Sequence, residues 1–281
     1  GCRVAAPITL TFQPSAGVPE SDLGIQVLQG GQLDLHGAPY KPTWTRLSAT
    51  VPRGSNIIYL QDSVSSWQPG QLLFVTTSIY RDEYENQNEV AAVQSVSSDG
   101  RTVVVDSPFQ YSHYGGSEYQ SEVGLLSRSL LLRSWPGSGT TSRGAHVRIM
   151  GQGRLEGVLS YQMGQRNVLG AYPFHWHNAG DAGRGVSYAK DCAVFASYYR
   201  CFVVHGTQNL QLTDNVAFHA TGSCFYLEDG VEEGNWLQHN LGAFVHVIGR
   251  PAGGVTQSGE VFVQGPDLAH PADAAAGVFY A

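Results

Sequence analysis

The sequence predicts an all-β protein built as a parallel β-helix, with a small β subdomain inserted into it. Charged residues make up only 14% of the 281 residues, whereas glycine occurs 34 times, which is typical of strands joined by tight turns. No long stretch places apolar residues at the i, i+3, i+4, i+7 spacing of an amphipathic helix. Short runs rich in β-branched and aromatic residues recur instead, separated by Gly, Asn, Asp and Ser.

The repeat is clearest between residues 201 and 246. When "CFVVHGTQNLQLTDNVAFHATGS" (201–223) is placed over "CFYLEDGVEEGNWLQHNLGAFVH" (224–246), the offset is 23 residues and Phe202 falls over Phe225. Such a period, with three short strands per turn, is typical of coils that stack at the strand spacing of about 4.8 Å. The other pairs in this frame are Cys201 over Cys224, Val204 over Leu227, His205 over Glu228, Phe218 over Leu241, Asp191 over Asp214 and Phe195 over Phe218, and Asn215 is matched with His239 at an offset of 24.

The strand runs divide the chain into three parts. Residues 1–42, with "ITLTF", "GIQVL" and "QLDLHG", predict the first β-helix coils. Residues 43–120 carry longer strands and polar loops such as "YRDEYENQNE", which predict a barrel-like β insertion with Trp44 and Trp67 in its core. Residues 121–281 predict the remaining β-helix repeats, with the stretch "SWPGSGTTSRG" (134–144) as a surface loop.

The charge balance narrows the range of partners. With 16 basic and 23 acidic residues the net charge is −7, and no Lys/Arg cluster is present. We therefore expect neither nucleic acid nor an anionic membrane surface as a partner. No apolar run approaches the ~20 residues of a membrane-spanning helix, so we expect no membrane-spanning segment in this chain.

The stretch "LGAYPFHWHNAGD" (169–181) raises the question of a functional site. Side chains alternate between the interior and the surface along a strand. Phe174 and Trp176 are therefore predicted to face inward, and His175 and His177 to face outward.

These histidines acquire neighbours when the coils are stacked. After allowance for the longer "GDAGRG" loop, His177, His205 and Glu228 form one outward column on successive coils. The adjacent column and the acids at the turns beside it are His175, Val203, Tyr226, Asp181 and Asp229.

Three interpretations of this cluster stay open. It binds a metal ion such as zinc, for which His175, His177, His205 and Glu228 are chemically suitable ligands, with the column His177, His205 and Glu228 as the favoured set. Alternatively, its acids perform acid–base chemistry on a glycosidic bond with histidine assistance. In the third interpretation it is a structural ladder, or is covered by a loop. The candidate catalytic residues are His175, His177, Asp181, His205, Glu228 and Asp229.

The cysteines leave two alternatives. Cys201 and Cys224 are predicted to be outward neighbours on successive coils, so a disulfide between them is geometrically allowed in an oxidising compartment. Two reduced thiols in a ladder fit the sequence equally well.

Several motifs together carry a family likeness. "LEGVLSYQMGQ", "LGAYPFHWHNAGD", "RCFVVHGTQNLQLTDNVAF", "GSCFYLEDGVEEGN" and "LQHNLGAFV" resemble the β-helix region shared by fibrocystin, fibrocystin-like proteins and the cell-surface, cell-migration-inducing hyaluronidases. The upstream "QVLQGGQLDLHGAPYKPTWTRL" resembles the end of the eight-glycine domain of those proteins. The resemblance spans residues 20–250 approximately and implies a right-handed parallel β-helix, with residues 1–42 containing the end of the eight-glycine domain.

The hyaluronidase branch of this resemblance implies calcium-dependent cleavage of hyaluronan by the six candidate residues. One departure argues against that activity. The family pattern reads Gly-Arg-Tyr-Pro, and here Ala171 replaces the arginine. An alanine cannot form the paired hydrogen bonds by which a guanidinium holds a carboxylate.

We therefore expect a non-enzymatic module. The resemblance implies a rigid extracellular segment of a large surface protein, at a cell or cilium surface, that contacts other surface or matrix proteins or glycans. The alternatives are a hyaluronan-type glycosidase that uses the candidate cluster, and a metal-dependent sugar-binding module without turnover. An open cleft over the cluster would favour an enzyme, and a covering loop would favour a structural role.

Overall fold

The computed structural model describes residues 3–4, 6–79, 86–182, 185–246, 248 and 278–280. The chain divides into two compact units, residues 1–38 together with 128–281, and residues 39–127. The first unit is interrupted in sequence by the second.

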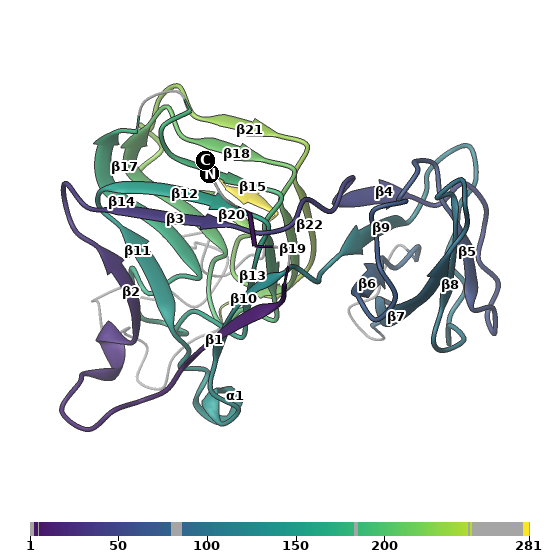
Figure 1. The fold of residues 1–281 in the computed structure, drawn as a ribbon, viewed down its shortest axis with the longest axis horizontal. Helices are drawn as coiled ribbons and strands as arrows, with labels where there is room; N and C mark the ends of the chain where they lie inside the picture. The colour runs from purple at the N-terminus through teal and green to yellow at the C-terminus, as the bar shows by residue number, and fades with distance from the viewer. Residues whose placement is uncertain are drawn as a thin grey trace, which may run out of the picture. The chain divides into compact units, whose positions relative to one another are not determined.

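The first unit is a parallel β-helix, which confirms the predicted fold class (Figure 1). In the described residues its strands form three parallel sheets, ordered β1-β10-β13-β16-β19-β22, β2-β11-β14-β17-β20-β23 and β3-β12-β15-β18-β21. One strand from each sheet makes up a rung, and the chain passes through all three before it rises to the next rung. The strands, grouped by rung, are β1 (Ile8–Phe12), β2 (Gly24–Val27), β3 (Gln32–His36); β10 (Leu130–Ser134), β11 (His146–Ile149), β12 (Gln152–Glu156); β13 (Val158–Tyr161), β14 (Phe174–Asp181), β15 (Tyr188–Lys190); β16 (Ala193–Phe195), β17 (Phe202–Gln208), β18 (Gln211–Thr213); β19 (Val216–Thr221), β20 (Phe225–Leu227), β21 (Trp236–Gln238); and β22 (Leu241–His246), β23 (Phe279–Tyr280).

The core of this unit contains a column of phenylalanines from three successive rungs. Phe174, Phe202 and Phe225 are fully buried, with ring centroids 5.4 and 5.1 Å apart. Trp176 and Val204 belong to the same core, as the alternation of side chains predicts. Burying each such side chain stabilises the folded state by about 1.5–3 kcal/mol.

The predicted register holds as far as β20, with Phe195 paired to Phe218, and fails in the last rung. Phe202 pairs with Phe225, as predicted. In the sheet of β19 and β22, however, Phe218 pairs with Ala243 and not with Leu241. The predicted contact of Asn215 with His239 is also wrong, because the side chain of Asn240 faces Asn215. The turn after β20 is two residues longer than its predecessor, and this extra length shifts every later pair.

The second unit contains one antiparallel sheet, ordered β4-β9-β6-β7-β8-β5. The backbone N–H of Gln61 donates to the carbonyl of Arg46, and Leu47 bridges to Leu60, so the two outer strands are joined. Trp67 lies in the core of this unit. The strands are β4 (Trp44–Arg46), β5 (Ile57–Tyr59), β6 (Leu72–Val75), β7 (Glu89–Val96), β8 (Thr102–Val105) and β9 (Glu122–Leu125).

The structure differs from the sequence prediction at Trp44 and in the loop 134–144. Trp44 was expected in the core but is only half-buried, because Thr45 is the residue of β4 that faces inward. The loop predicted at 134–144 contains one short helix, α1 (Ser138–Thr141). The only other helix of the described residues is the 3-10 helix η1 (Glu20–Asp22), and neither is long and apolar enough to cross a membrane.

The cysteines lie inside the β-helix, so their predicted outward orientation is wrong. Cys201 and Cys224 are fully buried members of the inner core, because each residue lies in the bend before its strand, where side chains do not yet alternate. Cys192, Cys201 and Cys224 are free thiols. Cys2 lies outside the described residues.

Candidate functional site

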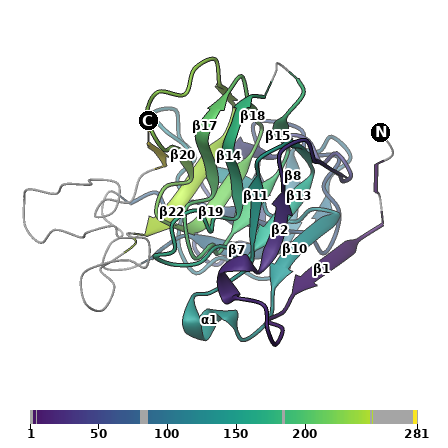
Figure 2. The same cartoon turned by 90° about the vertical axis from the view of Figure 1, so that its left-hand side faces the viewer.

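The candidate histidines lie on the sheet that contains β11, β14, β17 and β20 (Figure 2). His175 and His177 belong to β14 and His205 to β17, and the parallel register pairs His177 with His205. Glu228 follows β20 directly, and its backbone N–H donates to the carbonyl of Val204. Because the rungs stack in register, the column predicted from the sequence is a set of neighbours in space.

Four side chains converge on one point. Nδ1 of His205 lies 3.0 Å from Nδ1 of His177. Oε2 of Glu228 lies 3.7 Å from Nδ1 of His205 and 3.7 Å from Nε2 of His175. One ligand atom from each histidine lies within 4.8 Å of the other two. Ligand atoms on a single tetrahedral zinc ion are about 3.3 Å apart, since Zn–N bonds are about 2.0–2.1 Å long. The 3.0 and 3.7 Å separations lie close to this value, and the widest histidine separation would have to shorten from 4.8 Å for all three histidines to share one ion.

The outer hydrogen bonds orient the ligand atoms toward this point. Nδ1 of His175 donates to the carbonyl of Gly170, 3.0 Å away, which leaves the lone pair on Nε2. Nε2 of His205 lies 3.2 Å from a carboxylate oxygen of Asp229, which favours a proton on Nε2 and a lone pair on Nδ1. Nε2 of His175 and Oε2 of Glu228 are buried and make no hydrogen bond within the described part of the chain.

Burial sets the charges of the free site. It lowers the pKa of His175 well below its usual value, and it also lowers the pKa of His177, with a contribution from His205. Both imidazoles are therefore neutral at pH 7, the form that binds a metal. Burial raises the pKa of the Glu228 carboxyl. A carboxylate that loses hydration in this way is stabilised by a nearby cation.

A buried pair of side chains holds Glu228 in place. The Tyr172 hydroxyl donates to Oε1 of Glu228 at 3.0 Å, and Nη1 of Arg200 donates to the Tyr172 oxygen at 3.0 Å. Arg200 is 2% exposed, and its guanidinium carbon lies 4.2 Å from the ring centroid of Tyr226. Burial raises the pKa of Tyr172 well above its usual value, so the hydroxyl keeps its proton. Oε1 is thereby engaged, and Oε2 faces the histidines.

The cluster is neither fully open nor fully covered. A cavity of about 250 Å³ reaches it, lined by Arg148, Leu169, Gly170, His175, His177, His205 and Glu228. His175 is nevertheless fully buried, because a second apolar cluster covers its side of the sheet. That second cluster consists of Tyr172, Tyr199, Val203, Tyr226 and Ile248.

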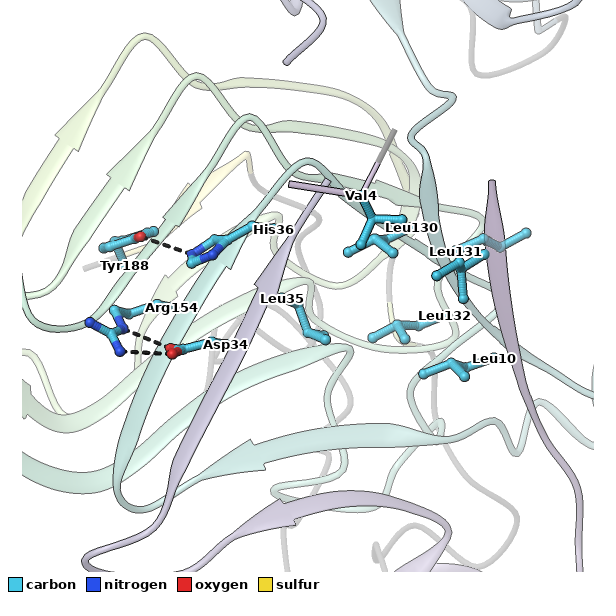
Figure 3. A pocket seen from close by; sticks show the side chains of 11 residues that line it. Val4, Leu10, Asp34, Leu35, His36, Leu130, Leu131, Leu132, Arg154 and Tyr188 are labelled. Atoms are coloured by element: carbon cyan, nitrogen blue, oxygen red, sulfur yellow. Dashed lines mark hydrogen bonds and ion pairs between the residues drawn. The ribbon is translucent and has the colours of Figure 1, made fainter. Parts of the chain in front are cut away.

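A larger cavity of about 560 Å³ lies against the first rungs, but its polar groups already pair with each other (Figure 3). Arg154 donates two hydrogen bonds of 2.7 Å to Asp34, and His36 lies 3.0 Å from the Tyr188 hydroxyl. The rest of the lining shown in Figure 3 is apolar. Polar groups that converge unpaired are typical of a ligand site, and among the described cavities only the smaller one combines them with several histidines.

The two remaining candidate acids take different positions. Asp229 contacts His205 at the edge of the cluster and is 46% exposed. Asp181 lies away from it, since its carboxylate accepts a hydrogen bond from Asn209 and borders a separate hollow of about 290 Å³. The structure does not bring Asp181 into the cluster, because it is the last residue of β14, four positions beyond His177, and pairs there with Gln208.

Sequence reasoning missed three residues around the site. Arg148 pairs with His175 in the parallel register, so extending the predicted columns back by one rung would have found it. Tyr172 and Arg200 belong to no strand, and nothing in the alternation pattern places them. Ala171, which stands where the family pattern has an arginine, is fully buried and supplies no charged group to the site.

Comparisons with known proteins agree with this fold. Residues 142–264 match the family described as CEMIP beta-helix. Protein rliB of Dictyostelium discoideum is 45% identical over 285 residues, which cover 99% of this chain and 25% of that protein. Human Fibrocystin-L is 33% identical over 264 residues, covering 76% of this chain and 6% of that protein. The chain is related to the fibrocystin-like and CEMIP-related family.

The family resemblance inferred from the sequence is thus confirmed. A G8 domain-containing protein of Dictyostelium discoideum is also 44% identical, over 99% of this chain and 19% of its own length. The chain spans a quarter or less of these relatives. Among solved structures, the tailspike protein gp49 of Pseudomonas phage LKA1 matches at 14% identity over 85% of this chain and 48% of its own, with a TM-score of 0.26, too low to carry an argument.

Proposed function

We propose that this chain is a rigid β-helix segment of a larger cell-surface protein, and that it binds one divalent transition-metal ion. His175, His177, His205 and Glu228 are the proposed ligands. The observation that carries the proposal is the pair of buried atoms, Nε2 of His175 and Oε2 of Glu228, that lie 3.7 Å apart without hydrogen-bond partners in the described chain. Each unpaired buried polar group costs about 1–3 kcal/mol, and one shared cation would satisfy both.

The ligand set favours a zinc-like ion over calcium. Calcium takes six to eight oxygen ligands, whereas this cluster offers three imidazole nitrogens and one carboxylate oxygen. Imidazole suits zinc, copper, iron and nickel. The sequence-based alternative of a calcium ion at this cluster is therefore the weaker one.

The wider role follows from the family and the shape of the fold. Fibrocystin-like relatives support a surface or secreted location. Contact with other surface or matrix proteins or with glycans is part of the proposal. Stacked rungs make a stiff solenoid whose faces suit such contacts. In this role the metal fixes the geometry of one face, at which a partner or glycan is recognised.

The test is metal binding by the whole chain. The protein is stripped with a chelator, titrated with Co²⁺ and Zn²⁺, and assayed for bound metal and for the visible absorption of Co²⁺. We expect one ion per chain. Because each ligand contributes directly, His177→Gln and His205→Gln should each lower the affinity by at least about 100-fold, beyond the 10–100-fold typical of outer-shell changes.

The matched control is His239→Gln. His239 is an exposed histidine that also pairs with a carboxylate, that of Asp214, at 2.7 Å, but it lies on another part of the β-helix. Its replacement should leave metal binding unchanged. No uptake of Co²⁺ or Zn²⁺ by the stripped protein, or equal affinity in His205→Gln and His239→Gln, would refute the metal site.

Glycoside hydrolysis is a second candidate, favoured by one observation. The raised pKa of the buried Glu228 carboxyl suits a general acid, and the exposed Asp229 is its neighbour. The two interpretations use Glu228 differently, because a general acid carries a proton whereas a metal ligand is ionised.

Incubation with labelled hyaluronan, with and without chelator, tests the second candidate. Hydrolysis predicts size reduction that Glu228→Gln abolishes. Unchanged hyaluronan length after prolonged incubation of the metal-loaded protein would exclude it for that polysaccharide and leave the metal-binding module.

A further inference from the structure

Arg148 is the one guanidinium that lines the cavity over the metal cluster. It lies on β11, one rung before His175, with which it pairs in register. Its Nε is buried and makes no hydrogen bond within the described residues. A Cβ built on Gly170 would lie 3.2 Å from Nη2 of Arg148 and 3.8 Å from Cε1 of His175. A side chain at position 170 would therefore contact both Arg148 and His175.

The charges around the cavity are unbalanced once a cation is bound. Arg148 and Glu228 line the cavity, Asp229 contacts His205 beside it, and the buried Arg200 is linked to Glu228 through the Tyr172 hydroxyl; this set is neutral by itself. A divalent ion adds two positive charges at the point where the ligands converge. Two cations facing one cavity of low polarity repel each other unless an anion lies between them.

We propose that the cavity binds a small carboxylate anion, one oxygen on the metal and the other on Arg148. This inference rests on the proposed metal site. A guanidinium presents paired donors that match the two oxygens of a carboxylate. The metal accepts the anion as a fifth ligand, an expansion from four to five ligands that zinc sites tolerate. The cavity of about 250 Å³ admits a carboxylate of a few heavy atoms, or the carboxylate end of a longer ligand.

Gly170 belongs to this arrangement. Its φ is +83°, a conformation that glycine adopts without strain. Its missing side chain also leaves the gap between Arg148 and His175 open. Any larger residue there would fill the space assigned to the anion.

The test uses the Co²⁺-loaded chain and sodium acetate as probe. Acetate is titrated at constant ionic strength, held with sodium perchlorate, while the visible spectrum of Co²⁺ is recorded. We expect a saturable spectral change that reports the added ligand. Arg148→Met should raise the apparent Kd for acetate by at least about tenfold, because a hydrogen bond to a charged group is lost. Arg148→Lys should recover part of this loss.

Two further measurements separate this role from a structural one. With no acetate present, Arg148→Met should bind Co²⁺ at least as tightly as the wild type, because a repelling charge has been removed. The control is Arg133→Met, whose guanidinium lies 5.7 Å from the ring centroid of Tyr161, on a different sheet. This variant should leave the acetate titration unchanged.

The outcomes distinguish this inference from the proposed function. If Co²⁺ does not bind, the metal site and the anion site fail together. If Co²⁺ binds but acetate leaves its spectrum unchanged, or binds equally well to Arg148→Met, only the anion site is refuted.

Discussion

The Tyr172→Phe variant removes only the hydroxyl oxygen, and so it tests whether the buried Tyr172 and Arg200 hold Glu228 in place. The hydroxyl donates to Oε1 of Glu228 at 3.0 Å and accepts from Arg200 at 3.0 Å. A hydrogen bond to a charged group is worth about 1.5–3 kcal/mol, and outer-shell partners of metal ligands contribute about 10–100-fold in affinity. Both estimates predict that zinc affinity falls by about 10–100-fold.

The assay is competition for Zn²⁺ against a chromophoric chelator at neutral pH. Tyr188→Phe is the matched control, because its hydroxyl also makes a side-chain hydrogen bond, with His36, but in the cavity of Figure 3. That control should bind zinc like the wild type. Urea denaturation of the metal-free proteins checks that each variant is folded.

A double-mutant cycle supplies the refuting result. If Tyr172 acts through Glu228, its replacement should have little effect on zinc affinity in a Glu228→Gln background. An equal loss in both backgrounds would show that the hydroxyl does not act through that carboxylate. If Tyr172→Phe alone leaves the zinc affinity unchanged, the proposal that Tyr172 holds Glu228 in place is refuted.

The core, the buried histidines and the buried thiols give further measurable outcomes. Phe202→Ala should lower the free energy of unfolding by about 3–5 kcal/mol, because the ring is fully buried between Phe174 and Phe225; a loss below about 1 kcal/mol in urea titrations would contradict this. The metal-free protein should lose stability as the pH falls below about 6.5, because the lowered pKa of His175 lets the unfolded chain take up the proton first. His175→Gln should show a shallower dependence, and equal slopes would refute this assignment. Burial raises the pKa of Cys192 to about 12, so thiol reagents should label it only after unfolding, and rapid labelling of the folded chain would be inconsistent with its burial.

The sequence predicted those parts of the fold that repeat. The offset of 23 residues was correct for Phe202 and Phe225, because each is the first residue of its strand and the two strands pair in register from there. It failed for Phe218, since turn length varies from rung to rung and leaves no periodic signal. Strand alternation likewise could not describe Cys201, which lies in a bend before its strand.

The site was predictable to the same extent. Stacking brought His177 and His205 together because both lie on strands in register. The burial of His175 was not predictable, because Tyr172 and other residues outside the strands cover it. Asp181 lies outside the cluster because β14 continues to this residue, whereas the sequence suggested a turn that would bring it back beside the histidines. Side chains that meet through regular backbone can therefore be inferred, whereas those supplied by irregular segments require coordinates.

The proposed ligands come from three consecutive rungs: β14, β17 and the residue after β20. In a solenoid each repeat contacts only its neighbours, so an end can fray one repeat at a time. A shared ion links three repeats, and none of them can detach without breaking a metal–ligand bond. Metal occupancy would then govern the cooperativity of unfolding, and with it the pulling force that this segment withstands.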